Sequence, residues 1–393
     1  MATLLQFGAG KVGRSFIGQL FAAAGYSVIF ADVYEPVVRA LNELGEYRVA
    51  IKRNGRDDEI LTVRGVRAID GKNLDAVAGA VAAADYLATS VGLGALPGIF
   101  PALAAGLRQR ASRPNHRPLD IIIAENIRDG ARYFANSLLP LLPPGFPLAN
   151  EVGLVETSIG KMIPLMRGEE VAADPLLLFA EEYSELIVDR RAFRGPLPQI
   201  PTLHPVENIK AYVDRKLFIH NLGHAATAYL GFRESPRTIF IWQALESPEV
   251  LADARSAMRE SAAALALEYP LDLSLGALDA HIEDLLGRFA NRALGDTLYR
   301  VGRDLYRKLA RDDRLVGAAL LAARHNLPFD HIAGAIRASV RFRATDDSGD
   351  LYPSDAAFAG TETPKGLAGV LRDVCGLRES DSTDREVMAR ILR

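Results

Sequence analysis

The chain has 393 residues, of which 49% are hydrophobic and 24% are charged, and its formal net charge is −3 at pH 7. This length suggests two or three domains, and the charge balance excludes a general nucleic-acid or membrane-surface binder. The single cysteine, Cys375, excludes an internal disulfide and a cluster of several thiolate ligands around a metal. Without a signal peptide or an apolar run of the roughly 20 residues that cross a membrane, we expect a cytoplasmic protein that acts on small molecules.

The first half of the chain predicts a regular alternation of strands and helices, which indicates a parallel, doubly wound α/β sheet. Within it, residues 47–63 alternate in polarity around Asn54 and Gly55, which is typical of a hairpin with a two-residue turn. The expected elements are, in chain order, a strand at 3–7, a helix at 11–24, a strand at 27–31, a helix from Pro36 to Leu44, a helix at 74–84, a strand at 85–89, a helix after Pro97, and strands at 120–124 and 152–155.

The sequence changes character near residue 195. Residues 176–188 are expected to supply a further strand pair, and the proline-rich stretch from Gly195 to Pro205 is the best candidate for a linker. Beyond it, long Ala/Leu/Arg-rich segments predict helices almost throughout. We therefore expect an α/β domain over residues 1–195 and a mostly helical domain over residues 196–393.

A glycine loop joins the first strand to the first helix. Its pattern is G-x-G-x-x-G, in the strand–helix context that binds dinucleotides. The first glycine permits a tight turn, the second lets the backbone approach a pyrophosphate, and the third lets the helix pack on the strand. A structural glycine turn with no ligand is the alternative. The cofactor-binding residues expected here are Phe7, Gly8, Ala9, Gly10, Lys11, Val12 and Gly13.

A second feature agrees with this interpretation. Asp32 ends the next strand, where a carboxylate can accept hydrogen bonds from the ribose hydroxyls of an adenosine. The same carboxylate would repel a 2′-phosphate, so the expected cofactor is NAD and not NADP. Ser90, in the run Thr89-Ser90-Val91-Gly92 after a later strand, is expected to line the same crevice.

Interconversion of an alcohol and a ketone needs a proton acceptor and a group that steadies the developing alkoxide. One cysteine and seven scattered histidines make a zinc site of the alcohol dehydrogenase kind improbable. The helix expected over 206–230 carries Lys216, His220, Asn221 and His224, which lie on one half of its surface at about 100° per residue. Spacing alone does not decide between the two histidines. A solvated lysine beside a core histidine is the alternative interpretation.

Two further groups are candidates for the same chemistry. Asn126 follows a buried strand, at the edge where ligands bind to open α/β sheets, and could donate to an oxyanion or only cap a helix. Arginines recur on one side of a continuous helix expected near residues 300–314, with Lys308 beside them. Guanidinium groups suit phosphate, although a solvated basic face would give the same pattern. The candidate phosphate-binding residues are Arg300, Arg303 and Arg307, and Arg314 continues the row.

Taken together, these segments resemble the polyol-specific long-chain dehydrogenases, the mannitol dehydrogenase family, and in particular its members that act on hexitol phosphates. The likeness runs from the first strand to about Asp350. The matching segments are Phe7-Gly-Ala-Gly-Lys-Val-Gly-Arg-Ser-Phe-Ile-Gly18, Ala31-Asp-Val33, Glu125-Asn126, Tyr183-Ser-Glu-Leu-Ile-Val-Asp189, Arg215-Lys-Leu-Phe-Ile-His-Asn-Leu-Gly-His-Ala225, Arg300-Val-Gly-Arg-Asp-Leu-Tyr-Arg-Lys-Leu309 and Arg341-Phe-Arg343.

The resemblance implies a Rossmann-type NAD-binding domain followed by a mostly helical domain, and catalysis without a metal. It implies that Lys216 is the general acid/base, that Asn126 and Asn221 hold the oxyanion, and that His224 and not His220 positions the reacting oxygen. The implied reaction converts mannitol 1-phosphate and NAD to fructose 6-phosphate and NADH, and the family suggests a monomer. In two places the sequence departs from the family: Gly160-Lys161 replaces Asp-Arg near the active site, and Lys11 and Ser15 replace Asn and Gly in the loop.

Two alternatives remain at this point. A dehydrogenase of an unphosphorylated polyol or hexonate would share the motifs but not need the arginines. A protein that senses NAD without turnover would explain the glycine loop but not the grouping of Lys216, Asn221 and His224.

Overall fold

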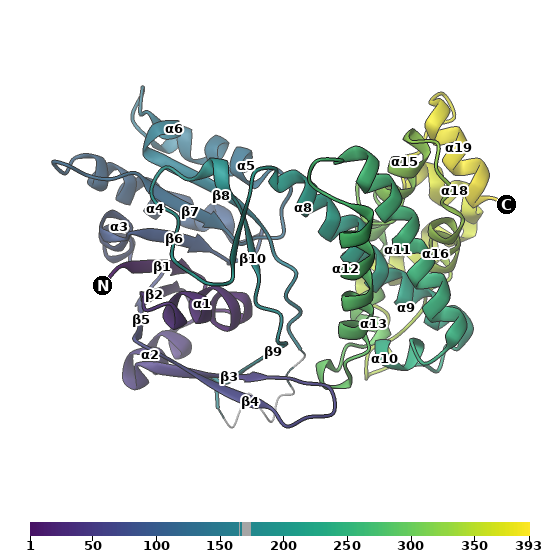
Figure 1. Ribbon diagram of the computed structural model, residues 1–393, viewed down its shortest axis with the longest axis horizontal. Coiled ribbons are helices and arrows are strands. Elements are labelled where there is room, and N and C mark those ends of the chain that lie inside the picture. The colour runs from purple at the N-terminus through teal and green to yellow at the C-terminus, as the bar shows by residue number, and fades with distance from the viewer. Residues whose placement is uncertain (165, 167–173) are drawn as a thin grey trace. The chain divides into compact units, whose positions relative to one another are not determined.

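The computed structural model describes residues 1–164, 166 and 174–393, which form two compact units, Met1–Ile209 and Lys210–Arg393 (Figure 1). Each unit has its own layers and its own core. The domain boundary expected at residue 195 stays a prediction.

An eight-stranded sheet forms the centre of the first unit. Its strand order is β11-β10-β8-β7-β6-β1-β2-β5, and the six strands from β8 to β5 are parallel. Phe7 at the end of β1 pairs with Ala31 on β2 and with Thr89 on β6, so these three strands end at one edge of the sheet. The strands are β1 Thr3–Phe7, β2 Ser27–Asp32, β5 Val66–Asp70, β6 Tyr86–Thr89, β7 Leu119–Ile123, β8 Val152–Ser158, β10 Leu186–Asp189 and β11 Leu203–Val206.

Both faces of this sheet are covered, as its nearly continuous apolar strands require. One core includes Phe16, Phe30 and Tyr47 and lies between the sheet and a layer of helices and short strands. The opposite core includes Phe100 and Phe134 and lies under helices. The first layer contains η1 Gly13–Gly18, α1 Gln19–Ala23, α2 Glu35–Leu44 and the small sheet of β4 Glu59–Arg64, β3 Glu46–Ile51 and β9 Leu178–Ala180. The second contains α3 Leu74–Ala83, α4 Leu96–Ala111 and α5 Gly130–Leu138.

Three expectations for this unit were wrong in detail. The hairpin of β3 and β4 forms, but residues 52–58 connect its strands, so Asn54 and Gly55 lie in a longer loop and not in a two-residue turn. The strands expected within 176–188 are β9 and β10, which pair with β3 and with β8, and not with each other. The expected linker contributes β11 to the large sheet. The pairings of β9 with β3 and of β10 with β8 join strands that are distant in sequence, which local patterns do not reveal.

The second unit consists of helices around α9. Nine of the thirteen residues of α9 are buried, and α11, α13 and α16 pack around it (Figure 1). A helix that is apolar on all sides is stable only inside a core, so α9 is a fixed support for the residues that precede it. The main elements are α8 Ile209–Arg215, η4 Lys216–Asn221, α9 Leu222–Glu234, α10 Ile241–Ala244, α11 Pro248–Glu268, α12 Leu275–Phe289, α13 Leu298–Gly302, α14 Leu305–Lys308, α15 Val316–Arg324, α16 Asp330–Val340, α17 Pro353–Thr361, α18 Gly366–Asp373 and α19 Ser382–Ile391.

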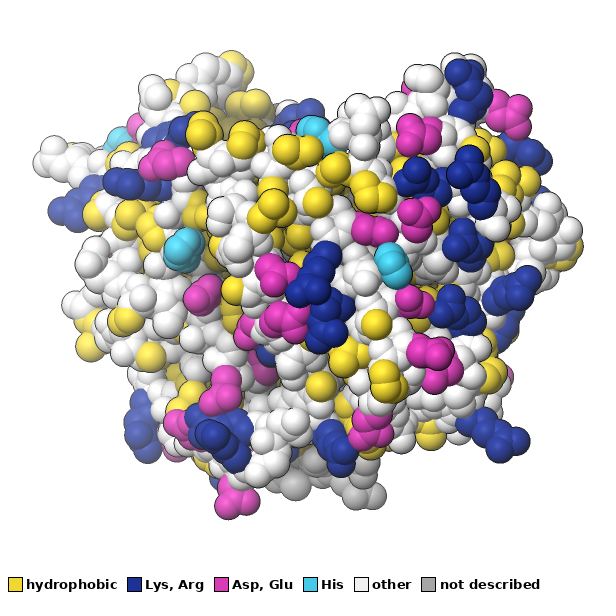
Figure 2. Space-filling view, turned by 45° about the vertical axis from the view of Figure 1, so that its right-hand side comes forward, with side chains coloured by type: hydrophobic (Ala, Val, Ile, Leu, Met, Phe, Trp, Pro, Cys, Tyr) yellow, Lys and Arg dark blue, Asp and Glu magenta, His cyan; other side chains and the backbone are white. Residues whose placement is uncertain are grey.

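Acidic and basic side chains are interspersed over the face shown in Figure 2, in keeping with the formal net charge of −3. Of the helices that the structure describes, none has both the length and the apolar composition needed to span a membrane.

Candidate active site

The glycine loop lies where β1 ends and combines one glycine in a left-handed conformation with one tightly packed glycine. Gly8 has a φ of +90°, a left-handed conformation that favours glycine. A Cβ on Gly13 would collide with the carbonyl oxygen of Gly8, so the helix can approach the loop this closely only without a side chain there. A Cβ on Gly10 would meet nothing within 4 Å, which leaves its backbone open to a ligand. This is the division of roles that a pyrophosphate-binding loop requires.

Hydrogen bonds join the loop to Asp32 and Ser90. The Ala9 N–H donates to Asp32 Oδ2 at 2.6 Å, while Asp32 Oδ1 accepts from the Tyr34 N–H at 2.9 Å. The Ser90 N–H donates to the Phe7 carbonyl at 2.9 Å. The structure therefore brings together the predicted residues from β1, β2 and β6 at one edge of the sheet.

Two buried side chains that the sequence analysis did not select hold this loop in shape. Arg14, which is 5% exposed, donates from Nε to the Ala9 carbonyl at 2.6 Å, and burial lowers its pKa. Gln6 is fully buried and its Nε2 donates to Ser90 Oγ at 3.0 Å. Arg14 follows Gly13 directly in a motif that was recognised, but nothing in its position predicts that a guanidinium is buried under the loop.

Asn126 lies just beyond β7, next to a carboxylate that shapes the neighbouring turn. Glu125 accepts the N–H groups of Val91 and Gly92 at 2.7 and 2.9 Å, and burial raises the pKa of its carboxyl. The loops after β6 and β7 are thereby fastened to each other. Asn126 consequently projects from a fixed segment at the edge of the sheet where the cofactor loop also lies.

Lys216 and Asn221 are the first and last residues of a π-helical turn, η4, between α8 and α9. An α-helix was expected here, in which two residues five apart point about 140° away from each other. In a π-helix the hydrogen bond runs from residue i to residue i+5, so residues five apart lie one turn apart on the same side. The π-helical turn thus aligns Lys216 and Asn221 more closely along the helix than the expected α-helix, in which they share one half of the surface but are about 140° apart.

His224 lies three residues further on, against an aromatic ring and near a carboxylate. Its ring stacks on Phe289 with centroids 4.6 Å apart and an interplanar angle of 6°. Its Nε2 lies 3.5 Å from Asp296 Oδ2. Burial, together with the charges of Arg300 and Arg314, lowers its pKa to about 3, so the imidazole is neutral at physiological pH. His220 is 6% exposed, and its ring packs edge-on against Phe289.

The amine of Lys216 lies in surroundings that disfavour its charged form. Burial lowers its pKa to about 8, and the guanidinium of Arg314 adds to this effect. A lysine with such a pKa can release and accept a proton near neutral pH, which an ordinary solvated lysine cannot do efficiently. Among the residues that the structure describes, no three His, Cys, Asp or Glu side chains are grouped so as to hold a metal ion.

The arginines do not lie on one continuous helix, so that expectation was wrong. Asp304 adopts a left-handed φ of +71° and separates α13 from α14. The carboxylate of Asp355, 51 residues further along the chain, accepts the N–H groups of Asp304 and Leu305 at 2.9 and 2.8 Å. Because these bonds satisfy backbone donors at the start of α14, they stabilise a second helix start that local sequence does not predict.

The break gives the three arginines different surroundings. Arg300 forms an ion pair with Asp296, the same carboxylate that faces His224. Arg303 lies over the rings of Tyr299 and Tyr352, at 5.7 and 5.0 Å from their centroids. Arg307 is half exposed and binds Asp304 at 2.6 Å. Of the three, Arg300 therefore lies beside the Lys216–His224 group, while Arg307 faces solvent.

The departure at Gly160-Lys161 lies in the first unit. Lys161 is 9% exposed and its Nζ lies 5.5 Å from the centroid of the Phe16 ring in η1. Gly160 faces Tyr183, since a Cβ there would lie 3.4 Å from the tyrosine ring. The segment that departs from the family thus places a glycine against the Tyr183 ring and a buried lysine near Phe16.

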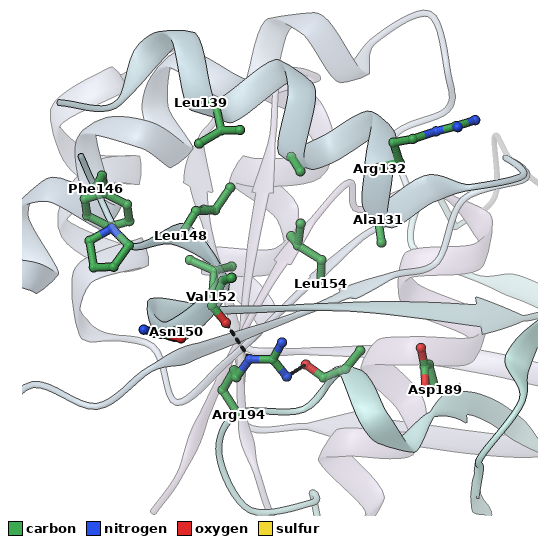
Figure 3. Close-up of a pocket in the computed structure, with 14 residues that line it drawn as sticks. Ala131, Arg132, Leu139, Phe146, Leu148, Asn150, Val152, Leu154, Asp189 and Arg194 are labelled. Carbon is green, nitrogen blue, oxygen red and sulfur yellow. Dashed lines mark hydrogen bonds between the residues drawn. The ribbon is translucent and has the colours of Figure 1, made fainter. Parts of the chain in front are cut away.

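A separate cavity of about 660 Å³ opens in the first unit, between α5, the short helix α6 (Leu148–Glu151) and β8 (Figure 3). Figure 3 shows a mostly apolar lining with Arg132, Asp189 and Arg194 at its edge. Arg194 donates from Nε to the Ala149 carbonyl at 2.6 Å, so it secures the wall. None of the residues predicted for catalysis or cofactor binding lines this cavity.

Known proteins match the chain over almost its whole length. A family model described as the mannitol dehydrogenase Rossmann domain matches residues 2–202, and one described as the mannitol dehydrogenase C-terminal domain matches residues 208–378. These matches confirm the expected fold class, a Rossmann-type sheet domain followed by a helical domain.

Two solved structures share this fold. A substrate-free D-sorbitol dehydrogenase is 15% identical, with a TM-score of 0.76, and the match covers 98% of this chain and 91% of that one. The ternary complex of Pseudomonas fluorescens mannitol 2-dehydrogenase with NAD and D-mannitol is also 15% identical, with a TM-score of 0.76, and the match covers 99% and 90%. At this identity the likeness shows the fold alone.

Proposed function

The chain belongs to the mannitol dehydrogenase family, and from this premise we propose that it is an NAD-dependent dehydrogenase that interconverts mannitol 1-phosphate and fructose 6-phosphate. The observation that carries the proposal is the group of cations around Lys216 and His224. The positive charges of Arg288, Arg300, Lys308 and Arg314 all lower the pKa of His224, and burial lowers the pKa of Lys308 itself to about 7. Arg300 and Arg314 pair with Asp296 and Asp313, and guanidinium groups gathered in this way suit a substrate that carries a phosphate.

The first unit fits NAD. The open backbone at Gly10 lets a pyrophosphate approach, and the N–H groups that follow it lie at the start of a helix. Asp32 places a carboxylate where a ribose with free hydroxyls is accepted and a 2′-phosphate is repelled. Bound there, NAD supplies a nicotinamide ring that takes up or returns a hydride.

The second unit supplies the proton chemistry. In the oxidation, the neutral amine of Lys216 would accept the proton of the substrate hydroxyl while the carbon that bears it gives up a hydride and becomes a ketone. In the reduction, the ammonium of Lys216 returns the proton to the developing alkoxide. Asn221, on the same side of the π-helical turn, donates to that oxygen without titrating, and we assign the same role to Asn126. The neutral imidazole of His224, fixed against Phe289, orients the reacting oxygen.

Arg300 is the principal phosphate ligand in this proposal, with Arg303 and Arg307 beside it. Arg300 is only partly exposed, and burial and Arg303 lower its pKa without removing its charge at neutral pH. In this proposal an arriving phosphate becomes a second anionic partner of the Arg300 guanidinium, beside Asp296.

The test compares fructose 6-phosphate with fructose as acceptors for NADH. We expect a kcat/KM about ten- to a hundredfold higher for the phosphorylated sugar, since a charge-assisted hydrogen bond contributes roughly 1.5–3 kcal/mol. Arg300→Gln should remove most of that preference by raising KM for fructose 6-phosphate. Fructose with added inorganic phosphate is the control, because it shows whether the phosphate must be attached to the sugar to raise kcat/KM. Equal efficiency with both sugars would refute the phosphate assignment and leave the family assignment untouched.

A dehydrogenase of an unphosphorylated polyol is the second candidate. It is supported by the two similar structures, a D-sorbitol dehydrogenase and a mannitol 2-dehydrogenase bound to D-mannitol. The Gly160-Lys161 segment also departs from the pattern of the family that includes the hexitol-phosphate enzymes. Preference for fructose over fructose 6-phosphate in the same assay is the outcome that favours this candidate.

A further inference from the structure

The residues just before α15 lie against the π-helical turn that carries Lys216. Gly317, in the first turn of α15, faces the ring of Phe218, since a Cβ on it would lie 2.8 Å from Phe218 Cε1. Phe218 is only two residues from Lys216 and is 6% exposed. The absence of a side chain at Gly317 thus lets this end of α15 approach η4, and Arg314 lies in the same turn of chain.

Arg314 is itself buried and held in place. It is 8% exposed, and both its backbone N–H and its Nε donate to Asp313 Oδ1, each at 2.7 Å. The second carboxylate oxygen of Asp313 lies 3.9 Å from Arg307 NH1. Because Asp313 already fixes this guanidinium, the side chain loses less conformational entropy in a further interaction than a flexible surface arginine does.

We propose that Arg314 is a positioning residue for the reaction, whose fixed positive charge acts on the amine of Lys216, and that Asp313 holds the guanidinium in place for this purpose. The proposal rests on the assignment of Lys216 as general base in the proposed function. It gives Arg314 a role through Lys216, distinct from the phosphate contacts assigned to Arg300.

The other charged groups near η4 do not account for the lowered pKa of Lys216. Asp214, on α8, accepts the hydroxyl of Tyr269 at 2.5 Å. His220 and His281 have their pKa values lowered by burial and are neutral near pH 7.

The remaining cations act mainly on the histidines. Arg215 lies over the ring of Tyr212, and its charge lowers the pKa of His281. Arg288 and Lys308 lower the pKa of His224, and α11 packs on η4 near the apolar side chain of Met258. Burial is the larger cause of the lowered pKa of Lys216, and the positive charge of Arg314 is the second.

The sign of the effect follows from Coulomb repulsion. A nearby positive charge disfavours the ammonium form, so it lowers the pKa of Lys216 and raises the fraction of free amine at neutral pH. If the charge of Arg314 is removed, the pKa of Lys216 rises, and the oxidation of the polyol needs a higher pH. The opposite direction, which uses the ammonium, becomes less sensitive to pH.

The experiment compares Arg314→Gln, Arg314→Lys and the double variant Arg314→Gln/Asp313→Asn with the parent protein. The double variant removes the carboxylate that the single change leaves unpaired. Arg259→Gln is the matched control, because Arg259 is an exposed arginine that pairs with Asp279 on the surface. Unfolding temperatures establish that each variant is folded.

Two readouts are measured across pH. The first is the rate of acylation of Lys216 by an amine-selective reagent in cofactor-free protein, followed by mass spectrometry of the peptide that contains it. The second is kcat for polyol oxidation. We expect Arg314→Gln and the double variant to move both midpoints upward by about one pH unit, so that oxidation at pH 7 falls about tenfold and recovers in alkali. Arg314→Lys and Arg259→Gln should keep the parent midpoint.

Three outcomes overturn the proposal. An unchanged midpoint with a raised KM for fructose 6-phosphate makes Arg314 a substrate ligand. An unchanged midpoint with a lower unfolding temperature makes it a structural residue only. A midpoint shifted equally by Arg314→Lys shows that geometry, and not charge, is responsible. The acylation measurement needs no substrate, so it decides the question even if the protein reduces neither sugar.

Discussion

In the part of the chain that the structure describes, each unit contains one π-helical turn, and in each the turn lies at the candidate site. In the first unit, η1 runs from Gly13 to Gly18 directly after the cofactor loop. In the second, η4 runs from Lys216 to Asn221. Such turns are rare and occur frequently at functional sites. Both span five residue steps, so in each the first and last residues lie one above the other.

The two turns differ in what their end residues contribute. Both ends of η1 are glycines, and a Cβ on Gly18 would lie 2.6 Å from Phe30 Cζ and 3.0 Å from the Tyr47 hydroxyl. The same tyrosine donates to the Arg14 carbonyl at 2.6 Å, which compensates a backbone group within the widened turn. Both ends of η4 carry polar side chains. The first turn therefore serves close packing beneath a loop that binds through its backbone, and the second serves to align two side chains.

The largest effect is expected from replacing the amine in η4. Lys216→Met should lower kcat by about a thousandfold or more, because general acid–base catalysis contributes roughly 10²–10⁴-fold. The affinity for NADH, measured by nucleotide fluorescence, should change little, since the cofactor loop lies in the other unit. Retention of full turnover would refute the general-base assignment and would favour a protein that only senses NAD.

The same substitution should stabilise the fold. The pKa of Lys216 is lowered to about 8, below its usual 10.5, so at pH 7 the folded protein carries an ammonium in an unfavourable place. The methionine removes this cost, and we expect the free energy of unfolding to rise by about 1–3 kcal/mol at pH 7. The gain should be constant below pH 8 and disappear toward pH 10.5. Denaturant unfolding at several pH values measures it.

A pair of alanine substitutions separates packing from binding in the first unit. Gly18→Ala should destabilise the fold by about 1–3 kcal/mol, because its methyl group would overlap with Phe30. Gly10→Ala meets open space, so the free energy of unfolding should hardly change, while the dissociation constant of NADH rises. Chemical denaturation and fluorescence titration on both variants measure the two quantities. Equal destabilisation by both would contradict the division of roles among the glycines.

The smallest effect is expected from replacing Asp32, the side chain on which the preference for NAD over NADP depends. Asp32→Asn should lower the preference for NADH over NADPH about tenfold, as the charge that repels a 2′-phosphate is lost while the shape is kept. Because Asp32 also accepts the N–H groups of Ala9 and Tyr34, some loss of NADH affinity is expected as well. Steady-state kinetics with both cofactors measure the ratio. A parent protein that prefers NADPH would contradict the role of Asp32.

Most of the first unit could be predicted because its signals are local. The glycine pattern, the strand before it and Asp32 after it lie within one strand–helix–strand segment, and the structure places them together. The buried guanidinium of Arg14 and the pairing of β9 with β3 could not be predicted, since both depend on groups more than a hundred residues away, Leu176 and the β9 strand itself.

In the second unit the sequence named the polar residues but not their arrangement. The spacing of Lys216, Asn221 and His224 is written in the chain, yet only the folded structure replaces an α-helical turn with a π-helical one. Asp296 and Arg300 are four residues apart in the chain, but packing of α13 against α9 brings this pair to His224.

By itself, the sequence determined the chemistry available to this protein: a phosphate-binding loop, a carboxylate after β2, an amine and an amide five residues apart, and a surplus of arginines. The tertiary structure decided which of these groups share surroundings and how they ionise. The physical reason is that a hydrogen-bonding pattern along the chain is local, whereas burial and Coulomb interactions depend on atoms that distant segments bring close. The lowered pKa of Lys216 beside Arg314 is the clearest case.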